Sequence, residues 1–207
     1  MPWWWKKKAK DTPATFNARA ETVTTKPMFR DAFKRKRCLI PASGYYEWQA
    51  TPTGKQPYYF STENGSPLTI AGLWDEWKDS ETGLPLMSCT MIITGANELA
   101  SKIHDRMPAL LTPFQFDAWL SGSAGLELLA PWDQRSLQTW TVSRRVNSSR
   151  ASSDDPTLTE RDQDRWHASL VMPPPPRLAG ALPRAGRSCA RGSYRADRSR
   201  PGGMACR

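Results

Sequence analysis

Clustered and alternating apolar positions predict a domain built mainly from short strands. Five segments after residue 37 are rich in aromatic and β-branched side chains, which are favoured in strands. Turn-forming residues at Pro52–Gly54, Asn64-Gly65 and Thr82-Gly83 fall between them. The predicted strands are Cys38–Trp48, Tyr58–Ser61, Leu68–Trp77, Ser88–Thr94 and Leu137–Val146.

Apolar residues at helical spacing predict a few short helices. In Thr25–Arg37, Pro27 suits the first turn, and the run Lys34–Arg37 places cations at the carboxyl end, where they complement the helix dipole. Further helices are expected over Asn97–His104 and after Thr112-Pro113. A few short helices among mostly antiparallel strands predict an α+β fold, either a partly closed barrel or packed sheets.

The chain changes character near residue 161. Residues 1–161 are long enough for one domain with a hydrophobic core. Residues 162–207 lack Lys and Glu, contain four consecutive prolines at 173–176, and show no apolar periodicity, so they are expected to be disordered. Their Arg/Pro/Gly bias fits either a nucleic-acid-binding tail or out-of-frame translation, and we favour the second.

Charge is distributed unevenly and suggests a polyanionic partner. The formal net charge is +9. Residues 1–48 carry 11 Lys or Arg against 4 Asp or Glu, whereas residues 49–161 carry 9 against 13. The basic amino-terminal part is therefore the surface expected to face the partner.

Cysteine and histidine usage gives no reason to expect a metal or another cofactor. The four cysteines lack metal-ligand spacing, and only two histidines are present. Cys38 and Cys89 are expected to be buried thiols in a reducing compartment. No apolar run reaches membrane-spanning length, and Trp3–Trp5 lead directly into lysines rather than into a signal-peptide core. A monomeric cytoplasmic protein is expected.

Three polar groups in structured settings suggest a site for proton transfer. Glu47 is a carboxylate among aromatic residues, and burial there would raise its pKa toward a useful range. His104 is the only histidine of residues 1–161, and Asn17 adds an amide. Each also has a structural alternative, which is the more frequent outcome for one residue alone: an exposed strand carboxylate, a helix cap and a turn residue. Asp105 and Arg106 could likewise form an ordinary surface ion pair.

Three motifs in this order resemble the SOS-response-associated peptidase family, whose members are also called abasic-site-processing proteins. They are Asn-Ala-Arg-Ala-Glu-Thr at 17–22, Gly-Tyr-Tyr-Glu-Trp at 44–48 and Ile-His-Asp-Arg-Met-Pro at 103–108. One motif alone is weakly specific, but the ordered set is highly specific. The resemblance covers residues 2–160.

The resemblance implies a protein that senses abasic sites in single-stranded DNA. In the family, an amino-terminal cysteine condenses through its thiol and α-amine with the ring-opened sugar aldehyde, which gives a covalent thiazolidine link. Self-processing peptidase and lyase-type activities accompany this chemistry. By carry-over, Asn17 would help to hold the cysteine, Glu47 would position or deprotonate its amine, and His104 would stabilise or protonate the opened sugar.

The resemblance also implies DNA contacts, and a nucleoid-associated location in a bacterium. Arg19 and Arg106 match positions expected to contact phosphates, and Thr94 is a possible hydroxyl donor to the same backbone. Trp4 and Trp5 resemble a pair that stacks on bases near the lesion, an interaction that tolerates any sequence.

The start of the sequence departs from the family pattern. A family chain begins Met-Cys-Gly-Arg and has a substantial segment before the Trp-rich stretch, whereas this sequence begins Met1-Pro2-Trp3. Cys38 and Cys89 cannot replace the nucleophile, because neither has a free α-amine. We therefore expect the nucleophile and the preceding strands to be missing, and the alternative function is a non-catalytic single-stranded-DNA-binding remnant.

Overall fold

Two separate β-sheets form the framework of the domain. The structure is a computed structural model, and it describes residues 1–6, 11, 15–79, 81–152 and 154–162. Every strand pair is antiparallel except β1 with β6, so the α+β prediction is confirmed in its packed-sheet form, and no closed barrel is formed by these residues. Sheet A has five strands. Four of them follow the order β1 (Asn17–Arg19), β6 (Pro85–Gly95), β5 (Leu68–Lys78) and β2 (Arg37–Ala42), and the fifth, β7 (Arg106–Pro108), also pairs with β6. Sheet B has three strands in the order β3 (Tyr45–Thr51), β4 (Gly54–Thr62) and β8 (Leu137–Thr141).

The helices are shorter than the sequence predicts. Only α1 (Arg30–Arg35) forms in the segment 25–37, because the chain before it runs in turns in which the Lys26 N–H donates to the Thr22 carbonyl at 2.9 Å. The predicted helix 97–104 reduces to a 3₁₀ turn at Ala100–Lys102. The start at Thr112-Pro113 is confirmed, since Gln115 caps it and α2 (Phe116–Ser121) follows. Other 3₁₀ turns cover Pro113–Gln115, Leu126–Leu128, Gln134–Ser136, Arg144–Asn147 and Pro156–Thr159.

The predicted strand 38–48 is in fact two strands in different sheets. The chain crosses from β2 in sheet A to β3 in sheet B at Ser43-Gly44. A Cβ atom at Gly44 would lie 2.3 Å from the Phe60 carbonyl oxygen and 2.4 Å from the Tyr59 ring, so this crossing requires glycine. The predicted strand 137–146 similarly ends at Thr141, before Ser143 caps a 3₁₀ turn.

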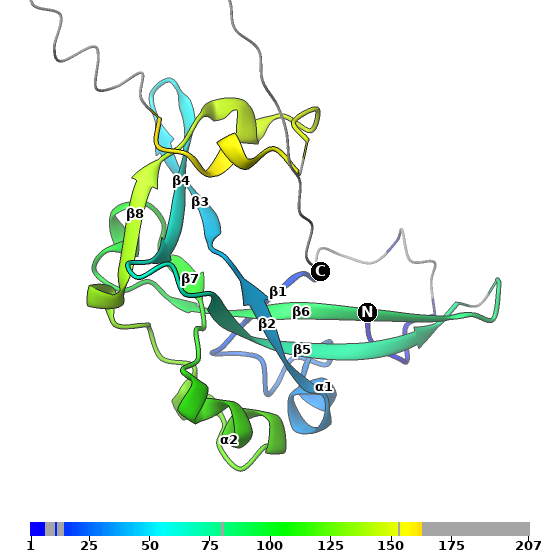
Figure 1. Cartoon of the computed structure of the whole chain (residues 1–207). Helices are drawn as coiled ribbons and strands as arrows, with labels where there is room; N and C mark the ends of the chain where they lie inside the picture. The colour runs from blue at the N-terminus through cyan, green and yellow to red at the C-terminus, as the bar shows by residue number, and fades with distance from the viewer. Residues whose placement is uncertain (7–10, 12–14, 80, 153, 163–207) are drawn as a thin grey trace, which may run out of the picture. The chain divides into compact units, whose positions relative to one another are not determined.

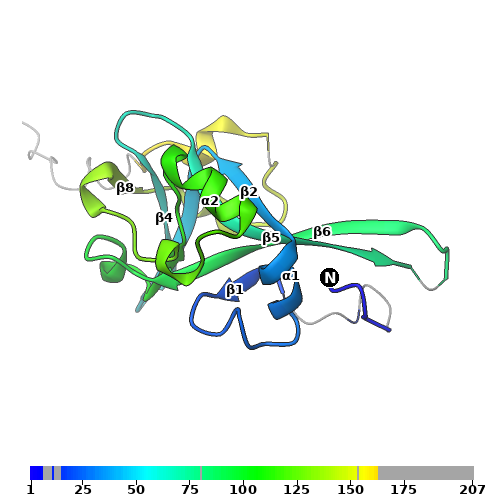
Figure 2. The ribbon, with the colours of Figure 1, turned by 90° about the horizontal axis from the view of Figure 1, so that it is seen from below.

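Sheet A lies between the helices and sheet B (Figure 1). Figure 2 shows the same ribbon from below, with α2 in front of β2. Successive side chains of β5 point to opposite faces of sheet A. Ala71 and Leu73 pack in the core under the helices, and Ile70 packs in the core under sheet B. We call these the helix-side core, which also contains Phe33, Ile92 and Trp119, and the sheet-side core, which also contains Phe60, Met107 and Leu137.

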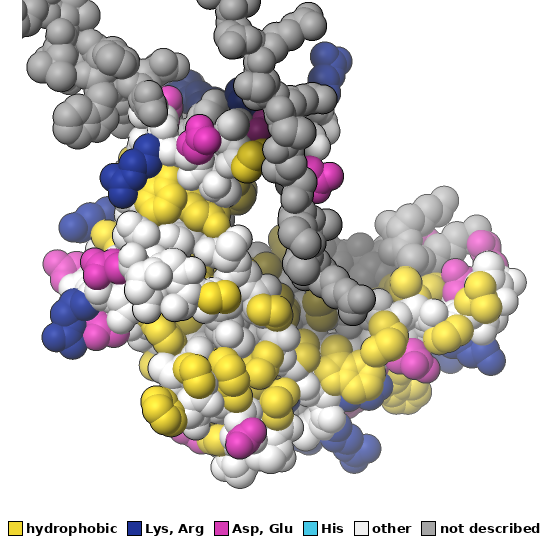
Figure 3. Space-filling model, viewed as in Figure 1, with side chains coloured by type: hydrophobic (Ala, Val, Ile, Leu, Met, Phe, Trp, Pro, Cys, Tyr) yellow, Lys and Arg dark blue, Asp and Glu magenta, His cyan; other side chains and the backbone are white. Residues whose placement is uncertain are grey.

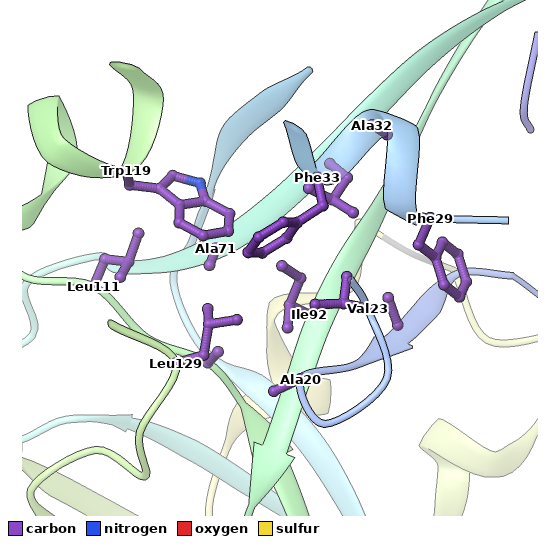
Figure 4. Packing of buried hydrophobic residues seen from close by; sticks show 13 residues of the cluster. Ala20, Val23, Phe29, Ala32, Phe33, Ala71, Ile92, Leu111, Trp119 and Leu129 are labelled. Carbon is purple, nitrogen blue, oxygen red and sulfur yellow. The ribbon is translucent and has the colours of Figure 1, made fainter. Parts of the chain in front are cut away.

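Arg37 and two aromatic rings hold α1 and α2 together. Phe33 and Trp119 point toward one another (Figure 4), with ring centroids 5.8 Å apart in an edge-on arrangement. The Arg37 guanidinium lies 4.4 Å from the Phe33 centroid and 4.5 Å from the Trp119 centroid. It also donates to the carbonyls of Phe33, Trp119 and Ala124. This cation of the basic segment therefore serves the fold.

The prediction that both core cysteines are buried is wrong for Cys89. Cys38 is half-buried, whereas Cys89 is exposed on the amino-terminal half of β6. Leu84, Leu86 and Met87 are also exposed, because this part of the β5–β6 hairpin extends past β1. Figure 3 shows apolar side chains along it. No helix among the described residues is long and apolar enough to span a membrane. The tail predicted for 162–207 lies outside these residues, except for Asp162.

Candidate functional site

Glu47 and His104 meet although they are far apart in sequence. Glu47 lies on β3 opposite Tyr58, and His104 lies in the turn that leads into β7. The His104 Nδ1 atom is 3.9 Å from the Glu47 Oε2 atom. The two side chains are 21% and 44% exposed for Glu47 and His104, respectively. The simple alternative of a solvent-exposed strand carboxylate therefore does not describe Glu47.

The surroundings of Glu47 favour its protonated form. Burial raises the pKa of this carboxyl, and the nearby Asp105 carboxylate raises it further. His104 and the backbone N–H of Trp48 act in the opposite direction and lower the pKa, but burial has the largest influence. A carboxyl with a raised pKa can hold a proton closer to neutral pH, as a general acid requires.

The imidazole of His104 is oriented by its own turn. Its Nδ1 atom accepts the backbone N–H of Arg106 at 3.1 Å and lies 3.3 Å from the Asp105 Oδ1 atom. Because Nδ1 is an acceptor, the neutral ring carries its proton on Nε2. This assignment follows from the hydrogen bond and leaves Nε2 as the donor available to a ligand.

Two predicted phosphate contacts lie on the strands that flank the end of β6. Arg19 is exposed on β1 opposite Ile93, and Arg106 lies on β7 opposite Gly95. The Arg106 guanidinium pairs with Glu21, so the simple alternative of an Asp105–Arg106 pair is not formed. A hydrogen bond from its own backbone and the Arg106 contact lower the pKa of Glu21. Glu21 was not among the predicted site residues, although it belongs to the motif at 17–22.

Asn17 and Thr94 occupy different environments. Asn17 is exposed opposite Met91 and, like Arg19, alternates with the buried Ala18, so both side chains project from the same face of β1. Thr94 is only 6% exposed and lies opposite Met107. Its hydroxyl is therefore largely covered in this state of the protein.

The tryptophan pair lies at the opposite end of the β5–β6 ladder. The Trp4 and Trp5 rings are 6.3 Å apart, and the Trp5 carbonyl accepts the indole N–H of Trp77 at 2.6 Å. Trp77 is opposite Leu86, eight residues along β6 from Thr94. At a rise of ~3.4 Å per residue, this separation is about 27 Å. The structure therefore does not bring Trp4 and Trp5 together with Glu47 and His104.

A metal-binding arrangement is absent from the described ranges, in which no three His, Cys, Asp or Glu side chains are placed to hold an ion. The ion pairs of the site involve four acidic or imidazole side chains, namely Glu47, His104, Asp105 and Glu21. The arrangement provides a carboxyl, an imidazole and neighbouring arginines, which suits proton transfer on an anionic ligand.

Comparison with known proteins identifies the family. The family model for SOS response associated peptidase (SRAP) matches residues 1–149. Abasic site processing protein YoqW of Bacillus subtilis is 38% identical over 157 residues, which cover 73% of this chain and 70% of that protein. HMCES of Xenopus tropicalis, also named an abasic site processing protein, is 38% identical over 115 residues, covering 47% of this chain and 34% of that protein.

Solved structures agree with the sequence comparison. The crystal structure of a protein from Bacteroides thetaiotaomicron superposes with a TM-score of 0.72 at 32% identity, covering 78% of this chain and 73% of that one. A second, from Bordetella bronchiseptica, gives a TM-score of 0.56 at 30% identity, covering 61% of this chain and 64% of that one. With matching motifs, fold and family model, the chain belongs to the SOS response associated peptidase family.

Proposed function

We propose that this domain recognises and processes abasic sites in single-stranded DNA. The observation that carries the proposal is the meeting of Glu47 and His104 at 3.9 Å, next to strands that bear exposed or half-buried arginines. Relatives of the chain from bacteria and a vertebrate are named abasic site processing proteins, which is consistent with this chemistry.

The ring-opened sugar of an abasic site is an aldehyde, and its capture by an amine requires two proton transfers. The amine must lose a proton as it attacks, and the resulting hydroxyl must gain one as water leaves. Glu47 suits the first role when ionised and the second when protonated, because burial raises its pKa. His104 can donate from Nε2 to the sugar oxygen, since Nδ1 is already occupied.

The DNA strand would be held through its phosphates. An abasic site has no base edge, so recognition depends on backbone contacts and on neighbouring bases. Arg19 and Arg106 supply cations on either side of β6, and Asn17 adds an amide on the same face as Arg19. Phosphate binding by Arg106 requires release of its pairing with Glu21.

The covalent thiazolidine step requires a 1,2-aminothiol. Cys38 and Cys89 are internal to the chain and have no free α-amine. We therefore assign binding and proton transfer to Glu47 and His104, acting on an aminothiol other than these cysteines. The same observation favours a second candidate, a non-catalytic single-stranded-DNA-binding protein, and the two differ in whether the site accelerates chemistry.

Free cysteine offers a direct test with the 207-residue chain. Free cysteine and an abasic strand condense to a thiazolidine and release water, with the new C–N and C–S bonds formed at the aldehyde carbon. We expect the protein to accelerate this reaction, and Glu47→Gln to slow it by about 100-fold, as is typical for loss of general acid–base catalysis. Mass spectrometry of the oligonucleotide measures the product, and Glu63→Gln is the control at an exposed glutamate.

The outcomes separate the two candidates. If the protein binds the strand but leaves the condensation rate at its value in buffer, the non-catalytic candidate is correct. If Glu47→Gln and His104→Gln accelerate the reaction as well as the unmodified protein does, the assigned proton-transfer roles are wrong.

A further inference from the structure

A groove beside α1 combines uncompensated positive charge with exposed aromatic surface. We call it the α1 groove; its volume is about 400 Å³, and its polar and aromatic lining comes from Trp3, Asp31, Lys34, Arg35, Lys36 and Asp75. We infer that the α1 groove binds single-stranded DNA flanking the abasic site. This inference rests on the proposed function for the identity of the strand, but it concerns a different surface.

The acidic side chains of the groove are already paired. The Asp75 carboxylate accepts the Lys36 ammonium at 2.6 Å and the Trp3 backbone N–H at 3.0 Å. Asp31 lies 3.7 Å from the guanidinium of Arg30. The lining therefore carries three cations (Lys34, Arg35 and Lys36) and two carboxylates, and both carboxylates have a cationic neighbour.

Two cations remain for a ligand. Lys34 and Arg35 are exposed, and neither makes an ion pair with any residue that the structure describes. Their place in the last turn of α1 complements the helix dipole, but a helix of six residues gains little from two such charges. Arg37, by contrast, is fully engaged with carbonyls and rings. Arg37 therefore stabilises the fold, whereas the side chains of Lys34 and Arg35 are available to a ligand.

Tryptophan provides the second half of the groove. Trp3 is 62% exposed, although its backbone is fixed by the hydrogen bond to Asp75. The Lys36 ammonium lies 5.2 Å from the centroid of Trp74, so a second indole borders the charged wall. Figure 3 shows Lys and Arg side chains near α1 next to the apolar surface of the hairpin. Cations that track phosphates beside rings that stack on bases are the usual elements of single-strand binding surfaces.

The distance from Glu47 and His104 fits a continuous strand. In the groove, Asp75 lies opposite Ser88, which is six residues along β6 from Thr94. This along-strand separation is about 20 Å, which corresponds to roughly six phosphates at ~3.4 Å spacing and to fewer in an extended DNA strand. Asp75 shares the helix-side face of β5 with Leu73, whereas Arg19 projects from the other face of sheet A. A DNA strand held at Arg19 must therefore also pass around an edge of the sheet to reach the α1 groove, so its path is longer than the separation along β6.

Salt-dependent binding tests the inference. Fluorescence anisotropy would measure binding of a labelled single strand of about 20 nucleotides, with and without an abasic site. In Lys34→Gln/Arg35→Gln, we expect the slope of log affinity against log salt to fall by about 1.4, and the affinity at about 0.1 M salt to fall roughly 25-fold. Lys55→Gln/Arg150→Gln is the matched control, because these two residues are also exposed.

Stacking is tested separately. Trp3→Ala is expected to weaken binding at least about fivefold without changing the salt slope, since a base–aromatic contact carries no counterion release. Circular dichroism on each variant checks that the fold is retained, and Trp3→Phe should restore most of the affinity.

The DNA-binding measurement and the cysteine condensation assay can succeed or fail independently of each other. The groove variants should lose affinity equally for abasic and undamaged strands. Unchanged slope and affinity in Lys34→Gln/Arg35→Gln, relative to the control, would overturn the inference even if Glu47-dependent condensation is observed. A reduced slope without Glu47-dependent condensation would support the groove and contradict the catalytic function.

Discussion

The two faces of sheet A differ in what covers them. Under α1 and α2, the helix-side core is closed, and even the cation Arg37 is engaged by two rings and three carbonyls. On the other face, sheet B covers the part near Ile70, while Cys89 remains exposed on the hairpin. The contrast indicates that the helix-side face supplies stability, and that the other face leaves polar groups available for chemistry.

The largest expected effect is on the closed face. Trp119 is fully buried, and its indole N–H donates to the Cys38 carbonyl at 3.0 Å. Trp119→Ala should lower the free energy of unfolding by about 3–5 kcal/mol, because it leaves a cavity and an unsatisfied carbonyl. Urea unfolding measures the change. Phe114→Ala, at a side chain 98% exposed, is the control and should be nearly neutral.

The two cysteines of the other face differ in exposure, since Cys38 is half-buried and Cys89 is exposed. Burial raises the pKa of Cys38 to about 11, with a further contribution from Cys89. At pH of about 8, Cys38 should therefore react with iodoacetamide roughly 100-fold more slowly than an ordinary exposed thiol, because the thiolate is the reactive form. Peptide mass mapping over time should find Cys89 modified first, and equal rates would show that Cys38 is not protected.

Arg37 tests whether the closed face needs a guanidinium or only a positive charge. Arg37→Lys keeps the charge but cannot reach three carbonyls in a planar arrangement. We expect a loss of about 1–3 kcal/mol in the free energy of unfolding. Arg35→Lys, in the exposed neighbour, should change it by less than about 0.5 kcal/mol. Similar losses in both would remove the distinction between the two cations.

The smallest effect is expected at Glu47, as a change with pH. Burial raises the pKa of this carboxyl in the folded protein, so its neutral form stabilises the fold below the unfolded pKa. That contribution is lost as pH rises through the folded pKa. Glu47→Gln should therefore gain stability relative to the unmodified protein from pH of about 4 upward. Thermal melts across this range measure the difference, which would stay constant if Glu47 were fully solvated.

The strand pattern and the identity of the Glu47 and His104 pair could be predicted from local sequence. That they act together could be expected only from the ordered motifs of the family resemblance. The geometry of their contact could not be predicted, because it depends on the crossing at Gly44 that places Glu47 in sheet B. The strands β1 and β7 have three residues each, too few for a periodic signal, and exist because β6 pairs with them.

The roles of individual charged residues also could not be predicted from the local sequence. The sequence indicates a basic amino-terminal segment, but the role of Arg37 depends on Trp119, which is 82 residues away. The position of Trp5 likewise depends on Trp77, 72 residues away. Long-range contacts of this kind decide which cations and rings face a ligand, and no local pattern contains them.

In the Arg106–Glu21 pair, the Glu21 carboxylate occupies the guanidinium and competes with any other anion that would bind Arg106. A solitary anion must displace a carboxylate that is tethered to the same domain and is therefore present at high effective concentration. A phosphate in a strand already held elsewhere on the protein arrives at a comparable effective concentration and can make the exchange. Under the proposed role of Arg106 in phosphate binding, Glu21 would therefore favour a polymeric anion over a small dissolved one.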